Sequence, residues 1–187
     1  MLNNVRNIKI LNIILGALKR RIKLNLFKYN KKMINKLNIT KEDFGQFILL
    51  KIINSKFNLD IKDIDIKELN LENKNLDNDI IEYLSKIKFN KLKVIHLEKN
   101  KISDIKQLEK VKFEKLEYLY LRENNISNID ILKKLTFKEL NLNYNDISDI
   151  KVLEKVKFEK LEKLNLIDNK IDKNKYSSII NNLKFNK

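Results

Sequence analysis

Apolar and polar positions follow one eight-residue pattern that recurs four times in the second half of the chain. Each copy reads aliphatic-x-Leu-x-x-Asn-x-Ile, where x is any residue, and the copies occupy Ile95–Ile102, Leu119–Ile126, Leu140–Ile147 and Leu164–Ile171. Successive copies start 24, 21 and 24 residues apart. A period of this length is typical of stacked repeats, which present a broad face instead of a deep pocket. The pattern therefore predicts a binding surface.

The positions within one copy have different expected roles. The two aliphatic residues that open each copy point the same way, because strand side chains alternate, so we expect them in the core. The asparagine follows where the chain turns away from the strand. An amide both donates and accepts, so a column of asparagines can satisfy backbone groups of a buried turn. The predicted structural ladder consists of Asn100, Asn124, Asn145 and Asn169. Removing one such amide, as in Asn124→Ala or Asn145→Ala, is predicted to cost roughly 1–3 kcal/mol.

The segments that lead from one copy back to the start of the next, which we call returns, are of two predicted kinds. A degenerate first copy begins at Leu69 and Leu71, with Lys74 at the asparagine position. Its return, residues 78–88, has a one-sided apolar stripe over about three turns, which predicts an α-helix. Later returns space their apolar residues by three, which favours 3₁₀ turns and a short helix. The sequence thus predicts about five units.

Helices are expected at both ends of the array. Residues 1–60 show helical spacing of apolar residues, and Thr40 with Asp43 forms a plausible capping box for a helix that runs to about Ser55. That helix is expected to bury some of Phe44, Phe47, Ile48, Leu50 and Ile52. Residues 173–187 predict a short amphipathic cap helix. The sequence therefore predicts three domains. Residues 1–60 form a basic helical region, residues 61–172 form the repeat array, and residues 173–187 form the C-terminal cap.

The repeats resemble a known family. The segment Leu116-x-x-Leu119-x-Leu121-x-x-Asn124-x-Ile126 is similar to the leucine-rich repeat. Its continuation, seen as Ile102-x-x-Ile105-x-x-Leu108, resembles the short subfamily typified by a nuclear phosphatase-regulatory subunit. The resemblance covers residues 64–172. It implies an α/β solenoid, a right-handed superhelix with a parallel β-sheet on the concave face and short α or 3₁₀ helices on the convex face. It implies no function beyond binding.

The composition limits the cellular compartments and the kinds of chemical site that we expect for this chain. The chain of 187 residues contains no Cys, which excludes disulfides, thiolate nucleophiles and Cys-ligated zinc and suits a reducing compartment. The longest apolar run, Ile8–Leu18, is too short to span a bilayer. Lys19–Arg21 follow it, where a signal peptide would need small residues. We therefore expect a cytoplasmic protein, with a nuclear location as the alternative and no secretion.

The positive charge is concentrated at the start of the chain. The formal net charge is +15, and residues 1–40 carry ten Lys or Arg and no Asp or Glu. Such a segment can bind nucleic acid, an anionic membrane or an acidic partner, although a solvated helical face explains it equally. Binding to nucleic acid or membrane through residues 1–40 is therefore an alternative and not the favoured function.

The candidate partner-binding residues lie between and around the inward leucines, on the predicted concave face. Tyr118, Tyr120 and Arg122 should fall near the middle of the sheet, with Tyr144 just beyond, and this composition is favoured at binding hot spots. The full set is Val94, His96, Glu98, Tyr118, Tyr120, Arg122, Glu139, Asn141 and Tyr144. Tyr118 and Tyr120 should be partly exposed if the patch binds a partner, and covered if it is structural.

No catalytic constellation is apparent. His96 is the only histidine, without a Cys or a second His to share a metal and without a recognisable nucleophile, while Glu98 lies close enough for an ion pair. With Gly16 and Gly45 as the only glycines, a phosphate-binding loop is not expected. We expect no enzyme activity, no metal and no cofactor. The predicted function is a monomeric protein–protein interaction module.

One further alternative concerns the N-terminal region. Residues 8–40 are faintly similar to an F-box, a helical motif that precedes repeat domains and docks on a ubiquitin-ligase adaptor. The Leu-Pro start and the late Trp of that family are missing here. The competing interpretation is a helical cap that buries Ile13, Leu24 and Phe27 against the first repeat.

Overall fold

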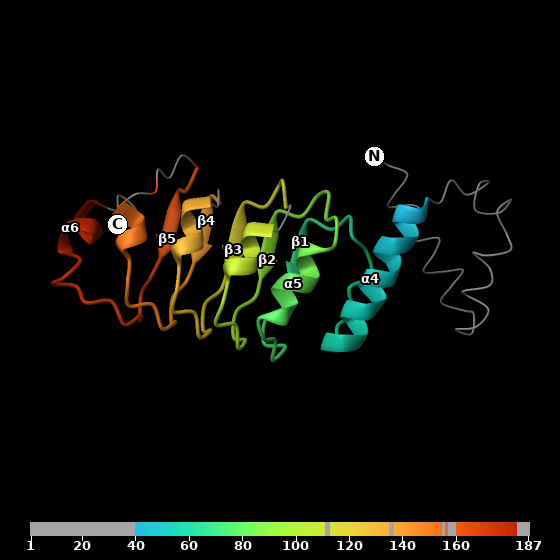
Figure 1. The fold of residues 1–187 in the computed structure, drawn as a ribbon, viewed down its shortest axis with the longest axis horizontal. Coiled ribbons are helices and arrows are strands. Elements are labelled where there is room, and N and C mark those ends of the chain that lie inside the picture. Colours follow the sequence, from blue (N-terminus) through green and yellow to red (C-terminus); the bar gives the residue numbers. More distant parts are fainter. Residues whose placement is uncertain (1–39, 111–112, 135–136, 155, 157–159, 183–187) are drawn as a thin grey trace, which may run out of the picture. The chain divides into compact units, whose positions relative to one another are not determined.

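The computed structural model describes residues 40–110, 113–134, 137–154, 156 and 160–182 (Figure 1). These residues divide into two compact units, the first ending at Asp65 and including Ile87–Phe89, the second made of Ile66–Lys86 and the chain from Asn90 onward. None of the helices within the described ranges has both the length and the apolar character needed to cross a bilayer. The basic segment 1–39 lies outside the described residues, so Ile13, Leu24 and Phe27 lie outside them too.

The described helix of the first unit is α4, Lys41–Phe57. The predicted capping box is confirmed: Thr40 Oγ1 accepts the Asp43 N–H at 3.1 Å, and Asp43 Oδ2 accepts the Thr40 N–H at 2.8 Å. The helix ends at Phe57, two residues beyond the predicted end, and its C-cap Asn58 has a left-handed φ of 51°. The Asn54 side chain then closes the following turn through both the N–H and the C=O of Ile61.

The buried face of α4 differs in part from the expectation. Phe47, Leu50 and Ile53 are buried, whereas Ile48 and Ile52 are 37% and 44% exposed. The physical reason is the helical period, because residues 47, 50 and 53 share one face and residues 48 and 52 lie on another. Of the five residues from which the buried set was expected, Phe47 and Leu50 are buried, and the expectation omitted Ile53.

The second unit contains a five-stranded parallel sheet with its strands in chain order. The strands are β1 Glu68–Asn70, β2 Val94–His96, β3 Tyr118–Tyr120, β4 Glu139–Asn141 and β5 Lys163–Asn165 (Figure 1). The central residue of each strand is buried and its two neighbours are not. This alternation places one layer of aliphatic side chains in the core, as the pattern predicts.

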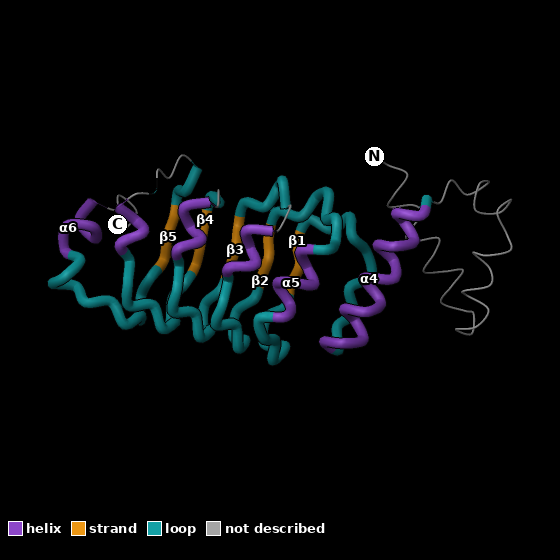
Figure 2. The backbone as a smooth tube through the Cα atoms, viewed as in Figure 1, coloured by secondary structure: helices purple, strands orange, loops and turns teal. Residues whose placement is uncertain are grey.

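Each strand is followed by a short return element that packs against the next return. These elements are α5 Asp79–Ser85, η1 Lys106–Lys110, η2 Asp130–Lys134, η3 Lys151–Glu154 and α6 Ser177–Asn182, and the η elements are 3₁₀ helices (Figure 2). The predicted α-helical first return and 3₁₀ later returns are confirmed. The second unit is thus the predicted short α/β repeat solenoid.

The repeated asparagines join each repeat to the one before it. Asn124 Nδ2 donates to the carbonyl oxygens of Leu97 at 2.9 Å and Leu121 at 3.1 Å, and its Oδ1 accepts the Ile102 N–H at 3.0 Å. Asn100, Asn145 and Asn169 make the same set of bonds in their repeats. Asn100, Asn124 and Asn145 are each 7% exposed, so these bonds lie away from water.

A left-handed residue precedes the asparagine position in every repeat. These residues are Asn73, Lys99, Glu123, Tyr144 and Asp168, with φ between 53° and 56°. Non-glycine residues pay about 1 kcal/mol for this conformation, which Asn tolerates best. The turn therefore stores strain in four of the five repeats, and the packed asparagine ladder holds it in place.

Candidate functional site

The strand register brings the candidate residues into three adjacent rows, which we call the strand face. The rows run Glu68, Val94, Tyr118, Glu139, Lys163, then Asn70, His96, Tyr120, Asn141, Asn165, and then, two residues past each strand, Glu72, Glu98, Arg122, Asn143, Ile167. None of these side chains is buried. The rows agree with those expected from the sequence, because every strand pairs with its neighbour without a register shift.

Aromatic side chains occupy the middle of the strand face. The His96 ring stacks on the Tyr120 ring with centroids 4.8 Å apart and planes 21° apart. Tyr118 and Tyr120 are both partly exposed, which is the condition set above for an interaction surface. Partial burial, and then the negative charge of Glu139, raise the pKa of Tyr120 above its usual range. The phenol therefore stays protonated and available as a donor at neutral pH.

Both ring nitrogens of His96 face carboxylates. Nε2 lies 3.3 Å from Glu68 Oε1, and Nδ1 lies 3.1 Å from Glu98 Oε1. The second oxygen of Glu98, Oε2, is buried and has no hydrogen-bond partner within the part of the chain that the structure describes. A neutral imidazole carries a single N–H, so it can donate to only one of the two carboxylates.

A second cluster lies toward the last repeats. The Arg122 guanidinium carbon sits 4.7 Å from the centroid of the Tyr144 ring, and Nη2 of the same residue pairs with Glu123 at 3.1 Å. The Asp168 carboxylate beside the Tyr144 hydroxyl raises the pKa of that phenol. Ile167, in the next repeat, is 65% exposed. An exposed aromatic ring, an exposed aliphatic side chain and a cation thus share one small area.

The remaining candidate residues bind mainly within the chain. Glu139 pairs with Lys163 across two strands at 2.9 Å, and Asn141 Oδ1 accepts the Asn143 N–H at 3.1 Å. Val94 is partly exposed beside Tyr118. Sequence reasoning omitted Glu68, Lys163 and Ile167 from the site, although their places in the rows would have identified all three.

The strand face is more acidic than the chain as a whole. Its four glutamates, at positions 68, 72, 98 and 139, outnumber its two cations, Arg122 and Lys163, while the chain carries +15. Glu72 is already paired with Lys99 at 2.8 Å, and that pair holds the pKa of Glu72 below its usual range. The carboxylates that lack a lysine or arginine partner in the described ranges are those around His96.

Charged side chains also line the edge where the strands begin. Glu117 accepts from Lys93 at 3.0 Å through one oxygen and from Lys138 at 2.9 Å through the other. Lys138 first, and then Lys93, hold the pKa of Glu117 below its usual range. This three-residue chain of charges joins three consecutive repeats and is part of the scaffold.

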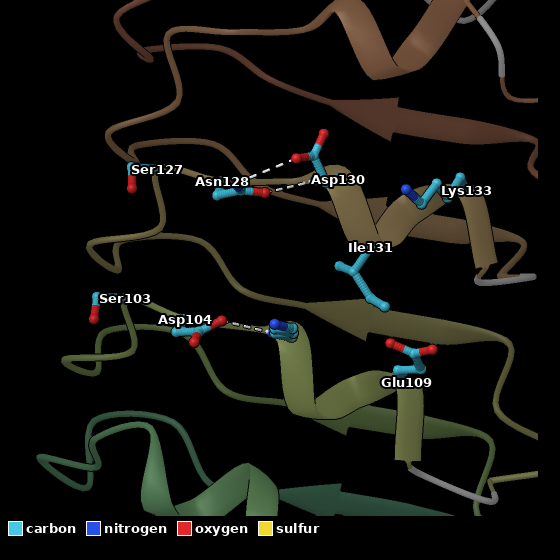
Figure 3. Close-up of a pocket in the computed structure, with 9 residues that line it drawn as sticks. Ser103, Asp104, Glu109, Ser127, Asn128, Asp130, Ile131 and Lys133 are labelled. Atoms are coloured by element: carbon cyan, nitrogen blue, oxygen red, sulfur yellow. Dashed lines mark hydrogen bonds between the residues drawn. The ribbon is translucent and has the colours of Figure 1, made fainter.

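A polar hollow lies on the other side of the array, between η1 and η2 (Figure 3). It is lined by Ser103, Asp104, Lys106, Glu109, Ser127, Asn128, Asp130, Ile131 and Lys133. Asp104 and Asn128 each accept a backbone N–H at the start of the adjacent 3₁₀ helix, from Lys106 and Asp130. These side chains therefore close turns of the chain itself.

No group of three or more His, Cys, Asp or Glu side chains in the described ranges is arranged to hold a metal ion. Both alternative functions, the F-box-like docking motif and the binding of nucleic acid or membrane, depend on residues that lie outside the described part apart from Thr40. The strand face is therefore the candidate binding site that lies within the described residues.

One family model matches a repeat of this chain. Residues 115–135, which include β3, match the family model described as Leucine Rich Repeat. No match was found among curated proteins. An internalin, InlF, from Listeria monocytogenes is 27% identical over 57% of this chain and 36% of its own, with a TM-score of 0.43. Internalin C2 from the same species is 20% identical over 70% of this chain and 78% of its own, with a TM-score of 0.30.

This chain spans about a third of the length of InlF. The phosphatase-regulator-like subfamily stays a prediction. The parallel sheet and the repeated asparagine bonds give the second unit the architecture of a short α/β repeat solenoid, and residues 115–135 within it match the leucine-rich repeat.

Proposed function

We propose that the chain is a non-catalytic interaction module that binds a protein partner on its strand face, the predicted concave face of the array. Leucine-rich-repeat domains generally bind proteins, and a stacked array offers a broad surface for them. The observation that carries the proposal is the partly exposed aromatic centre, in which His96 stacks on Tyr120 beside Tyr118. Tyrosine and arginine are the residues most often found at binding hot spots.

The dimensions of the strand face suit an extended segment or a loop of a partner. Five strands about 4.8 Å apart give a surface roughly 20 Å across. Tyr118 and Tyr120 lie on the middle strand, where a partner excludes water from both sides. Central, desolvated aromatic side chains contribute most to affinity, whereas the charged rim contributes little.

His96 supports the non-catalytic part of the proposal. Its two ring nitrogens face the carboxylates of Glu68 and Glu98, and its ring stacks on the ring of Tyr120. These contacts orient the imidazole as part of the surface. A general base would instead need one nitrogen directed at a nucleophile or at the substrate.

The proposal is tested by affinity capture with the intact chain and then by titration of the purified partner. We expect Tyr118→Ala/Tyr120→Ala to weaken binding by about 30-fold or more, as expected for hot-spot residues. The control is Tyr83→Ala, because Tyr83 lies on the return helix α5. Equal weakening by both variants, or unchanged binding by the double variant with a native circular dichroism spectrum, would refute the proposal. The monomeric state and the cytoplasmic location stay predictions.

A further inference from the structure

The chemistry of the strand face points to the kind of segment that it binds. We propose that it takes an extended segment with a basic side chain, arginine or lysine, beside Glu68 and Glu98, and with an aromatic or aliphatic side chain four residues further on, against Tyr144 and Ile167. This inference rests on the proposed function, since it names the partner chemistry of the same surface.

The basic side chain is inferred from two carboxylates that lack a cation. Glu68 and Glu98 both face His96, which can donate to only one of them when its ring is neutral. The free oxygen of Glu98 is buried without a hydrogen-bond partner within the described ranges. The Glu68 side chain is 61% exposed, so a charged donor of a partner can reach its carboxylate, and charge-assisted hydrogen bonds are the strongest.

The cation that stands next to Glu98 in its row of the strand face does not pair with the Glu98 carboxylate. Arg122 occupies the next place in the same row, but its guanidinium pairs with Glu123 and lies over the Tyr144 ring. The Tyr120 ring stacks on the His96 ring, whose nitrogens face the two carboxylates. A tyrosine face next to a carboxylate is a favourable place for an arginine or lysine, which interacts with both.

The apolar position is inferred from the second cluster. Tyr144 and Ile167 are two of the four large apolar or aromatic side chains that are exposed in the described ranges. They lie in neighbouring repeats, and the Tyr144 N–H donates to the Ile167 carbonyl oxygen at 2.9 Å. The Arg122 guanidinium lies over the Tyr144 ring, and Ile167 stays exposed. A partner's apolar side chain placed here would cover both exposed residues.

The spacing follows from the strand separation. Glu98 lies in the second repeat, Tyr144 in the fourth and Ile167 in the fifth. At about 4.8 Å per repeat, the apolar cluster is roughly 10–14 Å from Glu98. An extended chain advances about 3.3 Å per residue and presents alternate side chains on one face, so residues i and i+4 lie about 13 Å apart on the same side.

The test is a selection of random dodecapeptides on the intact chain, followed by affinity measurement by fluorescence anisotropy. We expect enriched peptides to carry Arg or Lys four residues before an aromatic or aliphatic residue. Replacing the basic residue by Glu should weaken binding at least tenfold, and Glu68→Gln/Glu98→Gln should weaken it at least fivefold. Affinity should fall as salt rises. The matched control is Glu82→Gln on α5, where Glu82 pairs with Lys86, and it should leave binding unchanged.

The outcomes separate this inference from the proposed function. Peptides that lose binding with Tyr118→Ala/Tyr120→Ala but show no basic preference, or prefer acidic residues, overturn the inference and leave the proposed function standing. Failure to enrich any peptide also overturns the inference. Enriched peptides that bind the tyrosine variant as tightly as the native chain overturn both, because their site is then elsewhere.

Discussion

Asn124→Ala removes the side chain that joins the second and third repeats. The Asn124 amide donates to the carbonyl oxygens of Leu97 and Leu121 and accepts the N–H of Ile102. Because Asn124 is only 7% exposed, water cannot easily take its place. The substitution therefore leaves backbone groups unsatisfied inside the array and does not simply shorten a surface side chain.

The magnitude follows from counting the groups that lose a partner. The Ile102 N–H loses its acceptor, which costs about 1–3 kcal/mol for a buried donor. The carbonyl oxygens of Leu97 and Leu121 each keep a second amide donor from a neighbouring asparagine, so together they add about 0.5 kcal/mol. We therefore expect the free energy of unfolding to fall by about 1.5–3.5 kcal/mol.

The matched control is Asn169→Ala in the fifth repeat. Asn169 makes the same set of bonds but is partly exposed, so water can replace its amide and the loss should be about 1 kcal/mol. Urea unfolding of the intact chain, followed by far-ultraviolet circular dichroism, compares the two variants. Equal losses at the two positions, or a loss below about 0.5 kcal/mol for Asn124→Ala, would refute the reasoning.

Three further predictions concern stability. Ile53→Ala should lower the free energy of unfolding by about 2–4 kcal/mol because Ile53 is fully buried, whereas Ile52→Ala, at a residue that is 44% exposed, should cost less than about 1 kcal/mol in the same urea assay. Glu123→Asn should raise thermal stability, by about 0.5 kcal/mol, because asparagine tolerates the φ of 55° at this position; an unchanged or lower melting temperature would contradict the strain argument. The pKa of Glu117 is lower in the folded than in the unfolded chain, so its stabilising contribution is present above the ordinary carboxyl pKa of 4.5 and is lost as pH falls through the folded value. Glu117→Gln should therefore flatten the acid side of a plot of melting temperature against pH. An acid side identical to that of the native chain would show that the ion pairs of Glu117 with Lys93 and Lys138 contribute nothing to stability.

The repeat pattern predicted the sheet and its rows because one rule governs every copy. An aliphatic residue at the same place in each repeat must face the same core, so Ile95, Leu119 and Leu140 align without a shift. Alternation then places His96 and Tyr120 side by side on the opposite face. The donor and acceptor on each asparagine amide made its role in the turn predictable from chemistry alone.

Other features depend on contacts that a single sequence does not reveal. The left-handed φ at Lys99, Glu123 and Tyr144 has no sequence signal, since none of these residues is Gly or Asn; the turn geometry imposes it. The position of the Arg122 guanidinium over Tyr144, away from Glu98, is a rotamer choice. Side chains at equal sequence spacing can adopt either arrangement, so the unpartnered carboxylate oxygen emerges only from coordinates.

The face of α4 is a third case. Seven apolar residues occur between positions 44 and 53, too many for one helical face, so periodicity alone did not determine which would be buried. Phe47, Leu50 and Ile53 are buried in the first unit, which leaves Ile48 and Ile52 exposed. The helical period sorts these residues into faces, but it does not say which face is covered in the folded chain.

Site-specific photo-crosslinking tests the central claim, that the strand face binds the partner, most directly. A photoreactive phenylalanine analogue replaces Tyr120 on β3 in one sample and Tyr83 on α5 in another, and each intact chain is irradiated with its captured partner. The account predicts a covalent adduct with the partner from position 120 and none from position 83. An adduct from position 83 with none from position 120 would contradict it, because the partner would then lie on the return side of the array.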